Sequence, residues 1–394
     1  MRYTKLKKII FCLAMAIVLT VCYVMPSQAA NESKNTETAD TNKDLDTHVD
    51  DGVPGKYDQD DFDTKEEYRN YLEKHPEEQI ETRAAKALEK PNVHVDAKLR
   101  YVINGLKSTA AIQKTYIGST YIYVIQRSGT NSYLSRCTIK GSTATYKDRM
   151  LLQNFGHGQT LEWFEHKGKP YFWITCKANT AYKKKYWGTQ IGRLEYKANQ
   201  TIDYTSITRF SHLSYANKSG KSFGSVKRVD AALSSDKSKL LFWVKDTDNE
   251  IQYSYYNAAK LNAALDKKVS ASSKYIACTE NAVKSACYGS FRQSGSSRAL
   301  PHGSCQGVEF SDAASIYIAG GAKGDTPQIA KMTGSGSTYK YTYLAEANHK
   351  SFNKTKTETE GLQLKGNDIY FGISDDSKTD SGYIFSIPKG AFKK

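Results

Sequence analysis

The chain has 394 residues and a formal net charge of +15, and 39% of its residues are hydrophobic. A chain of this length stabilises itself through its own core, and 7 cysteines are too few for a disulfide-held scaffold. After Met25 no apolar run approaches the roughly 20 residues that span a bilayer, which excludes a protein with several membrane helices.

Residues 1–30 are predicted to be a secretory signal peptide. Basic residues precede an apolar stretch at residues 9–24, and the small residues Ser27 and Ala29 indicate cleavage near Ala29 or Ala30. A retained membrane anchor and a lipoprotein modified at Cys22 are the alternatives. We therefore expect an exported protein that is secreted or held at the cell wall.

Residues 31–96 are predicted to form an acidic leader, with 18 acidic and 9 basic side chains up to residue 95. The composition predicts disorder from residue 31 to about residue 65. Thr64 and Glu67 have the spacing of a capping box, which predicts a short helix interrupted at Pro76. We expect this segment to act as a spacer or a pro-segment.

The rest of the chain, residues 97–394, carries the excess of positive charge. A strongly basic body behind an acidic leader predicts a polyanionic partner. For an exported protein, a wall polymer, an anionic membrane surface or an acidic glycan fits this expectation better than nucleic acid does. Ordinary solubility charge is the alternative.

From about residue 97 the helical pattern gives way to short runs rich in Tyr, Ile, Val and Phe, which predict an all-β domain. One phrase recurs five times: a polar-led strand, a hairpin, an apolar and aromatic run, and a partly polar strand. The apolar runs lie at residues 121–125, 171–175, 240–244, 315–319 and 368–372. Such a repeat predicts a radial or stacked β architecture.

A fourth strand fits between successive repeats, at residues 149–153, 207–210, 275–278 and 341–345. The stretch at residues 99–103 resembles these strands but precedes the first repeat, so it is placed to complete the last one. A displaced strand of this kind closes a ring and protects the sheet edges. We therefore predict a five-bladed β-propeller over residues 97–394, with a pair of β-sandwiches as the alternative.

In a propeller the first strand of each blade lines the central channel, so polar residues in these strands converge near one axis. The predicted ligand-binding cluster comprises His157, Gln159, Asp230, His302, Gln306 and Glu360. Convergent hydrogen-bonding groups suit a small polar ligand or a sugar. Hydrogen bonding between neighbouring blades and buried water is the alternative. Asp230 and Glu360 would also supply the two carboxyl groups of a glycosidase.

A long loop that contains Lys183, Lys184, Lys185, Tyr186 and Trp187 combines cationic and stacking side chains. If solvent reaches it, this loop is suited to grip a phosphate-rich or glycan polymer, and a solvated charge run is the alternative. The sequence contains no phosphate-cradling Gly-Lys-Ser/Thr loop, no nucleophile elbow and no His-Glu-x-x-His zinc motif. We expect no catalytic residue, no metal site and no cofactor.

Five cysteines remain after the signal peptide, and no Cys-x-x-Cys spacing suggests zinc or a redox pair. Because the number is odd, at least one thiol is free or pairs between chains. Cys278 and Cys287 are near enough in sequence to bridge. The sequence leaves the pairing and the oligomeric state open.

Three phrases of the repeat region carry a family resemblance: YIYVIQRSGTNSYLSRC, GHGQTLEWFEHKGKPYFWITCK and WGTQIGRLEY. With them the chain resembles the helveticin J family of large class III bacteriocins, over about residues 97–394 but not over the signal peptide and leader. The resemblance implies a secreted, heat-labile antibacterial protein that acts on related Gram-positive bacteria. It carries over no catalytic or metal-binding residue.

We therefore expect a secreted antibacterial protein that binds an anionic or glycan component of the target cell envelope and associates with it peripherally. A non-toxic, lectin-like adhesin that holds wall polymers or glycans is one alternative. A wall-degrading glycosidase is the other.

Overall fold

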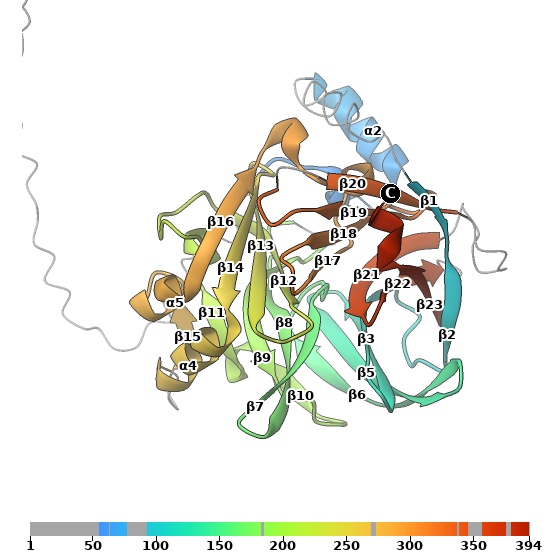
Figure 1. Cartoon of the computed structure of the whole chain (residues 1–394), viewed down its shortest axis with the longest axis horizontal. Coiled ribbons are helices and arrows are strands. Elements are labelled where there is room, and N and C mark those ends of the chain that lie inside the picture. The colour runs from blue at the N-terminus through green and yellow to red at the C-terminus, as the bar shows by residue number, and fades with distance from the viewer. Residues whose placement is uncertain are drawn as a thin grey trace, which may run out of the picture. The chain divides into compact units, whose positions relative to one another are not determined.

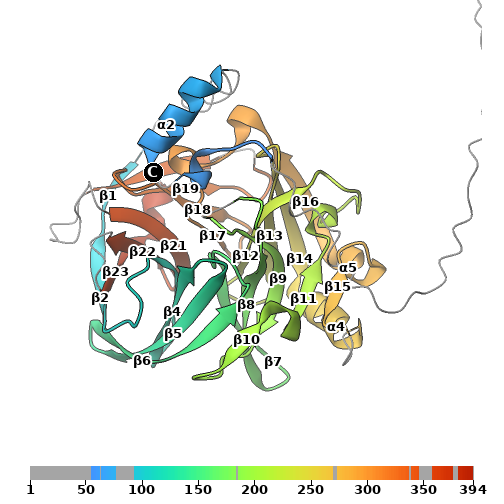
Figure 2. The same ribbon diagram turned by 180° about the vertical axis from the view of Figure 1, so that it is seen from behind.

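The computed structural model describes residues 55–62, 64–76, 93–182, 185–268, 273–336, 339–345, 357–375 and 380–393. All of them belong to one compact unit, Leu45–Lys394. The predicted signal peptide and the first part of the leader lie outside these residues. The described part of the chain consists mainly of β-strands with a few short helices, as predicted (Figure 1 and Figure 2).

The described strands form groups within which neighbouring strands pair in antiparallel fashion, and each apolar run forms the second strand of its group. The first group contains β3 (Ile112–Ile117), β4 (Tyr121–Ser128), β5 (Asn131–Lys140) and β6 (Thr143–Gln153). The second contains β7 (Leu161–His166), β8 (Lys169–Ala178), β9 (Gly188–Leu194) and β11 (Thr208–Ser211). The third contains β12 (Val226–Leu233), β13 (Lys239–Asp246), β14 (Ile251–Asn257) and β16 (Cys287–Gln293). The fourth contains β17 (Gly307–Phe310), β18 (Ile316–Gly320), β19 (Gln328–Met332) and β20 (Tyr339–Ala345).

The last group joins the two ends of the β-domain. It contains β21 (Thr357–Lys365), β22 (Asp368–Asp375) and β23 (Gly382–Pro388), and it is completed by β2 (Lys98–Asn104). β2 pairs antiparallel with β23, where Leu99 lies opposite Phe385. Its other end pairs parallel with β6, so the first and last groups share one sheet. The predicted closing strand at residues 99–103 is confirmed.

The first strands of the groups contact one another in a cycle. β3 contacts β7 and β21, β12 contacts β7 and β17, and β17 contacts β21. Glycines allow two of these close approaches, since a Cβ on Gly307 would lie 2.8 Å from the Cα of Gly361. A Cβ on Gly361 would in turn lie 2.9 Å from the carbonyl oxygen of Gln113. The arrangement is β-propeller-like, with the first strands innermost.

Replacing Gly361 by alanine is expected to lower the free energy of unfolding by about 1–3 kcal/mol, because the added methyl group overpacks the contact between β21 and β3. Gly390→Ala is the matched control, since a Cβ there meets no atom within 4 Å. Urea unfolding of both variants measures the difference. Equal stabilities for the two variants would contradict the close approach of these strands.

The fourth strand of the third group differs from the prediction. Residues 275–278 contain β15 (Tyr275–Ala277), which pairs parallel with β11 of the second group, so this prediction is wrong. The fourth strand of the third group is instead β16, which pairs with β14. It comes later in the sequence than predicted because two helices, α4 (Ala258–Lys268) and α5 (Asn281–Ala286), are inserted before it. Both helices lie beside β15 in Figure 1.

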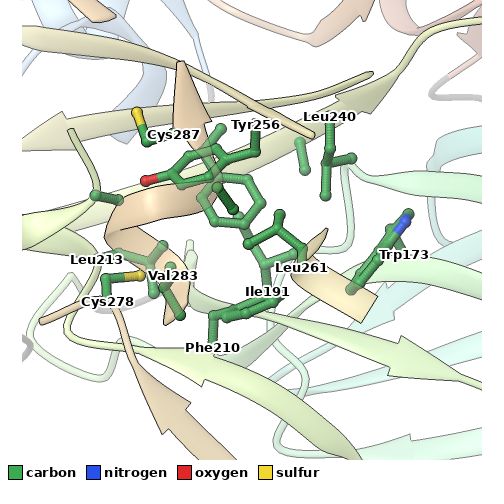
Figure 3. Close-up of a cluster of buried hydrophobic side chains, with 14 of the residues drawn as sticks. Trp173, Ile191, Phe210, Leu213, Leu240, Tyr256, Leu261, Cys278, Val283 and Cys287 are labelled. Carbon is green, nitrogen blue, oxygen red and sulfur yellow. The ribbon is translucent and has the colours of Figure 1, made fainter. Parts of the chain in front are cut away.

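The inserted helices cover an apolar cluster between the second and third groups (Figure 3). Trp173 of β8 and Phe210 of β11 lie with ring centroids 6.0 Å apart. Leu261 of α4 and Val283 of α5 are completely buried in the same cluster. Burial of this apolar surface fixes the helices on the sheet edges, since each large apolar side chain contributes about 1.5–3 kcal/mol.

The cysteines of the described residues form no disulfide bond with one another and are all buried: Cys137, Cys176, Cys278, Cys287 and Cys305. Cys278 and Cys287 belong to the apolar cluster of Figure 3 but do not bridge in this structure. In such surroundings a thiol packs as a small hydrophobic group.

The described leader contains the 3-10 helix η2 (Gln59–Asp61), the helix α2 (Lys65–Lys74) and the strand β1 (Val93–Asp96). The side chain of Thr64 accepts a hydrogen bond of 3.1 Å from the amide of Glu67, which confirms the predicted helix start. β1 pairs parallel with β20, so pairing begins before the predicted boundary at residue 97. Disorder up to about residue 65 is wrong from Gly55 onward, because this stretch packs against the β-domain.

The remaining described elements are short. They are β10 (Thr201–Asp203), which pairs parallel with β6, and the 3-10 helices η4 (Tyr204–Ser206), η5 (Leu213–Tyr215), η6 (Gly295–Ser297), η7 (Pro301–Gly303) and η8 (Lys389–Lys393). No helix in the described residues has the length and apolar character needed to cross a membrane.

Candidate functional site

A pocket of about 340 Å³ lies where the leader meets the β-domain. The leader lines it with Gln59, Asp60, Phe62 and Thr64. The β-domain contributes Ala111, Gln113, Arg127, His157, Lys185, Trp187, Ser304, Gln306, Ala322, Lys323, Glu358, Glu360 and Ser374. This lining combines amides, carboxyl groups and cations with aromatic surface, which suits a small polar ligand or one unit of a polymer.

Two of the predicted glutamines meet across the β-domain. Nε2 of Gln159 donates a hydrogen bond of 2.9 Å to Oε1 of Gln306, although 147 positions separate these residues in sequence. Nε2 of Gln306 donates in turn to Oε1 of Glu358 at 2.8 Å. Gln306 lines the pocket, and Gln159 holds its amide in a fixed orientation.

Glu360 also lines the pocket from β21, as its predicted place near the axis implies. Burial raises the pKa of Glu360 well above its ordinary value, and the charge of Glu358 adds to the rise. Its Oε2 has no hydrogen-bond partner among the described residues. This shift favours the protonated form of the carboxyl group, which both donates and accepts hydrogen bonds.

His157 lines the pocket with its ring stacked on Trp187, at 4.2 Å between ring centroids. Nδ1 lies 2.8 Å from the carbonyl oxygen of Lys185. Because a carbonyl oxygen only accepts, Nδ1 carries the hydrogen of this bond. Burial, together with the charges of Arg127 and Lys185, lowers the pKa of His157 well below its ordinary value. The ring is thus neutral, and its Nε2 is an acceptor.

Of the predicted cluster, His157, Gln306 and Glu360 line this pocket, whereas Gln159, Asp230 and His302 do not. Asp230 is buried in an ion pair with Arg228, with its Oδ2 at 2.8 Å from the guanidinium, and its Oδ1 accepts from Thr160 at 3.3 Å. Nε2 of His302 is 2.9 Å from the carbonyl oxygen of Thr326. The predicted glycosidase pair of Asp230 and Glu360 therefore does not face one pocket.

The loop at residues 183–187, which is predicted to bind a polyanion, is only partly described, because Lys183 and Lys184 lie outside the described residues. Nζ of Lys185 donates to the carbonyl oxygen of Phe62 at 3.1 Å, and Lys185 lines the pocket. Trp187 is 3% exposed, so the expectation that solvent reaches its ring is wrong. The ring is covered because Arg228 lies over it at 4.1 Å and Asp61 accepts from its Nε1 at 3.2 Å.

A cluster of buried cations beside the pocket was missed by the sequence analysis. It consists of Lys227 and Arg228 on β12 and Lys245 on the neighbouring strand β13, where Arg228 and Lys245 are paired in register. Their side chains are at most 1% exposed. The sequence does contain a signal for this cluster, namely basic residues inside strands that are otherwise mostly apolar. A lysine or arginine buried in such a strand requires a charged partner. We call these three residues the cation cluster.

The leader supplies the partners of the cation cluster. Nζ of Lys245 lies 2.6 Å from Asp58 and 2.8 Å from Asp60. Nζ of Lys227 lies 2.5 Å from Asp61 and 3.4 Å from Asp58. These distances are those of charge-assisted hydrogen bonds.

Asp60 extends the contact, since it lies 3.3 Å from Arg228 and accepts a hydrogen bond of 3.1 Å from the amide of Cys305.

Burial and the neighbouring opposite charges shift the pKa values of these ion-paired groups in opposite directions. Burial favours the neutral form of Asp58, but the charges of Lys227 and Lys245 outweigh it and hold the pKa of Asp58 far below its ordinary value. Burial likewise disfavours the charged form of Lys245, but Asp58 and Asp60 outweigh it and raise the pKa of Lys245. Burial raises the pKa of Asp61 in spite of Lys227. Lys245 thus remains charged in spite of its burial.

A second buried ion group joins three first strands. Nζ of Lys114 on β3 lies 2.9 Å from Glu162 on β7 and 2.7 Å from Glu309 on β17. All three side chains are at most 5% exposed. Burial and the charge of Glu162 raise the pKa of Glu309 to about 8, so Glu309 keeps its proton at neutral pH. None of the three lines the pocket, and the group ties the inner strands together.

Within the described residues no group of three or more His, Cys, Asp or Glu side chains is placed to hold a metal ion.

Solved structures with some likeness to the chain include an exo-β-1,3-galactanase from Phanerochaete chrysosporium, crystallised with β-1,3-galactotriose. It is 7% identical, with a TM-score of 0.41 and coverage of 74% of this chain and 63% of that chain. A GH43_1 enzyme from Xanthomonas citri is 9% identical, with a TM-score of 0.38 and coverage of 74% and 89%. Likenesses of this size assign neither a substrate nor an activity to this chain.

Sequence comparison gives a family. The bacteriocin helveticin-J of Lactobacillus helveticus is 29% identical over 175 residues, which cover 40% of this chain and 51% of the relative. The chain thus spans about half of the length of that relative. The sequence model of the family described as bacteriocin helveticin-J matches residues 91–388, which is more than half of the chain and includes every strand from β1 to β23. The resemblance of the repeated strand phrases is therefore confirmed, and the chain belongs to the helveticin J family.

Proposed function

We propose that the chain is a secreted bacteriocin that binds an anionic or glycan component of the envelope of target bacteria through the pocket described above. Membership of the helveticin J family supports the antibacterial part of this proposal. The observation that carries the binding part is the convergence of His157, Gln306 and Glu360, from separate parts of the chain, on one pocket.

We further infer that each four-stranded group is one blade of a five-bladed propeller. The cycle of contacts among β3, β7, β12, β17 and β21 supports this count. The pocket would then lie at one mouth of the central channel, with its walls drawn from several blades. Fixed walls of this kind preorganise hydrogen-bonding groups, so less conformational entropy is lost when a ligand binds.

The chemistry of the pocket suits a sugar or a sugar phosphate. The carboxyl group of Glu360 and the amide of Gln306 pair with hydroxyl groups, and Lys185 supplies a cation for an anionic substituent. His157, whose ring is stacked on the covered ring of Trp187, adds its imidazole to the lining.

A wall-degrading hydrolase is the second candidate, because two carboxyl groups, Glu358 and Glu360, line the same pocket. A glycosidase combines one protonated and one ionised carboxyl group. The raised pKa of Glu360 fits the protonated partner. A lectin-like adhesin uses the same pocket without harm to the bound cell.

One assay separates these functions. The purified full-length chain is incubated with walls and with live cells of related Gram-positive bacteria, and wall retention, viable counts and soluble wall fragments are measured together. The bacteriocin predicts retention with a loss of viability and no fragment release. Retention without loss of viability indicates the adhesin, and released fragments that disappear in Glu360→Gln indicate the hydrolase. Neither retention nor killing across the panel would overturn the proposal.

A further inference from the structure

The leader residues 55–62, which we call the acidic strap, lie directly on the β-domain. The amide of Gly55 donates to the hydroxyl group of Tyr182 at 2.7 Å, and the amide of Lys56 donates to the carbonyl oxygen of Thr247 at 2.7 Å. The ring of Tyr57 packs edge-on against Tyr182, 5.8 Å between centroids, yet remains 36% exposed. The strap is therefore held at its start by a few contacts at the surface and farther on by its aspartates.

The aspartates of the strap neutralise the cation cluster almost alone. Among the described residues, Lys227 and Lys245 form ion pairs only with strap aspartates. Arg228 shares its charge between Asp60 and Asp230 of its own strand. Without the strap the β-domain would hold three neighbouring cations against the single carboxyl group of Asp230. Buried charges left unpaired in this way are strongly unfavourable, so the cluster requires an anion.

The cation cluster is also connected to the pocket. Asp60, which pairs with Arg228 and Lys245, itself lines the pocket. Trp187 lines it too, while its ring contacts Arg228 and its Nε1 donates to Asp61. A ligand in the pocket that carries several anionic groups would thus meet the cluster at the place where the strap carboxylates lie. These carboxylates stand in for the anionic groups of that ligand.

We propose that Lys227, Arg228 and Lys245 form a binding site for the anionic groups of an envelope polymer, and that Asp58, Asp60 and Asp61 occupy this site as an internal competitor. The inference rests on the proposed function, because it names the chemical class of ligand that the pocket takes. Both phosphodiester and carboxylate groups satisfy the site, since each pairs with arginine and lysine through charged oxygens. A polymer with closely spaced anions displaces the strap by filling all three positions at once.

The test compares two full-length triple variants with the unmodified chain. Asp58→Asn, Asp60→Asn and Asp61→Asn together remove the charges of the strap. Glu66→Gln, Glu67→Gln and Glu73→Gln together make the same change in net charge on exposed positions of α2 and serve as the control. Binding to soluble polyglycerol phosphate and to polygalacturonate is measured by titration at fixed ionic strength, and urea unfolding verifies that each variant is folded.

We expect the strap variant to bind one of the two polymers about tenfold more tightly than the unmodified chain, because an internal competitor lowers apparent affinity in proportion to its occupancy. The α2 variant should bind like the unmodified chain. Tighter binding of the phosphate polymer alone identifies phosphodiesters as the ligand group, and tighter binding of the other polymer alone identifies carboxylates. Equal affinities of all three chains overturn the inference but leave the proposed function standing if the unmodified chain still kills. Absence of both binding and killing overturns the two together.

A measurement on the unmodified chain keeps the inference testable if the strap variant does not fold. Saturating polymer should speed hydrogen exchange of the backbone amides in residues 55–62, since the displaced strap loses its buried contacts. Exchange in β14, which lies outside the pocket, serves as the internal reference. Unchanged exchange in residues 55–62 with the polymer bound would overturn displacement of the strap.

Discussion

Replacing Lys114 by methionine is expected to lower the free energy of unfolding by about 3–5 kcal/mol, the cost of leaving buried charges without a partner. Lys114 is 1% exposed and is the cation between Glu162 and Glu309. Without it, both carboxyl groups must be protonated or remain buried as unpaired anions. Because the three residues belong to three first strands, the loss weakens the contacts that hold the inner strands together. Urea unfolding at pH 7 measures the loss.

Two further variants show whether charge or packing causes this loss. Lys114→Met combined with Glu162→Gln and Glu309→Gln removes the whole ion group and should recover most of the stability, because neutral side chains need no buried counterion. Lys260→Met, at an exposed position of α4, is the matched control and should change stability by less than about 0.5 kcal/mol. A Lys114→Met variant as stable as this control would contradict a structural role for the ion group.

The stability contributed by Glu309 should fall as the pH rises from 4.5 towards 8. The pKa of Glu309 is raised from 4.5 to about 8 by burial and by the charge of Glu162. Within this range the folded state keeps a proton on Glu309 that the unfolded chain has released. The contribution of Glu309 to the free energy of unfolding is therefore complete below pH 4.5 and lost above pH 8. The slope is at most about 1.4 kcal/mol per pH unit for one proton.

Other groups titrate in the same range, so the test compares slopes between variants. The raised pKa of Glu360 has the same sign of effect, and the lowered pKa of His157 has the opposite sign. Glu162→Gln removes the neighbouring charge while keeping the shape of the side chain, so the pKa of Glu309 should drop. Urea unfolding between pH 5 and pH 8 should therefore show a smaller loss of stability in this variant. Parallel curves for the two proteins would contradict the effect of Glu162 on the pKa of Glu309.

The strand order was predictable because its signals are local. Each apolar run, such as residues 240–244, is flanked by turns and rich in residues that favour strands. The displaced strand at residues 99–103 followed from counting fourth strands and from the need to close sheet edges. The meeting of Gln159 with Gln306 followed from the place of first strands in a ring, although no local pattern joins residues so far apart.

Local sequence patterns do not predict the structure where long-range pairing or an insertion decides it. Residues 55–62 have the composition of a disordered segment, but they pack on the β-domain, where Lys227 and Lys245 lie buried beneath them. The same contacts cover Trp187, which its basic loop had suggested to be exposed. In α4 the spacing of Leu261 and Leu265 does indicate a helix.

The most direct test of pocket-mediated killing is a viable count of related Gram-positive bacteria after exposure to two double variants and the unmodified chain. Lys185→Ser with Gln306→Ala alters the pocket. Lys260→Ser with Gln200→Ala changes the same residue types at exposed positions that do not line it. We predict that the unmodified chain and the second variant reduce the count equally, while the first loses most of this effect and remains folded. Undiminished killing by the pocket variant would contradict the assignment of the pocket, and absence of killing by the unmodified chain would contradict the antibacterial function.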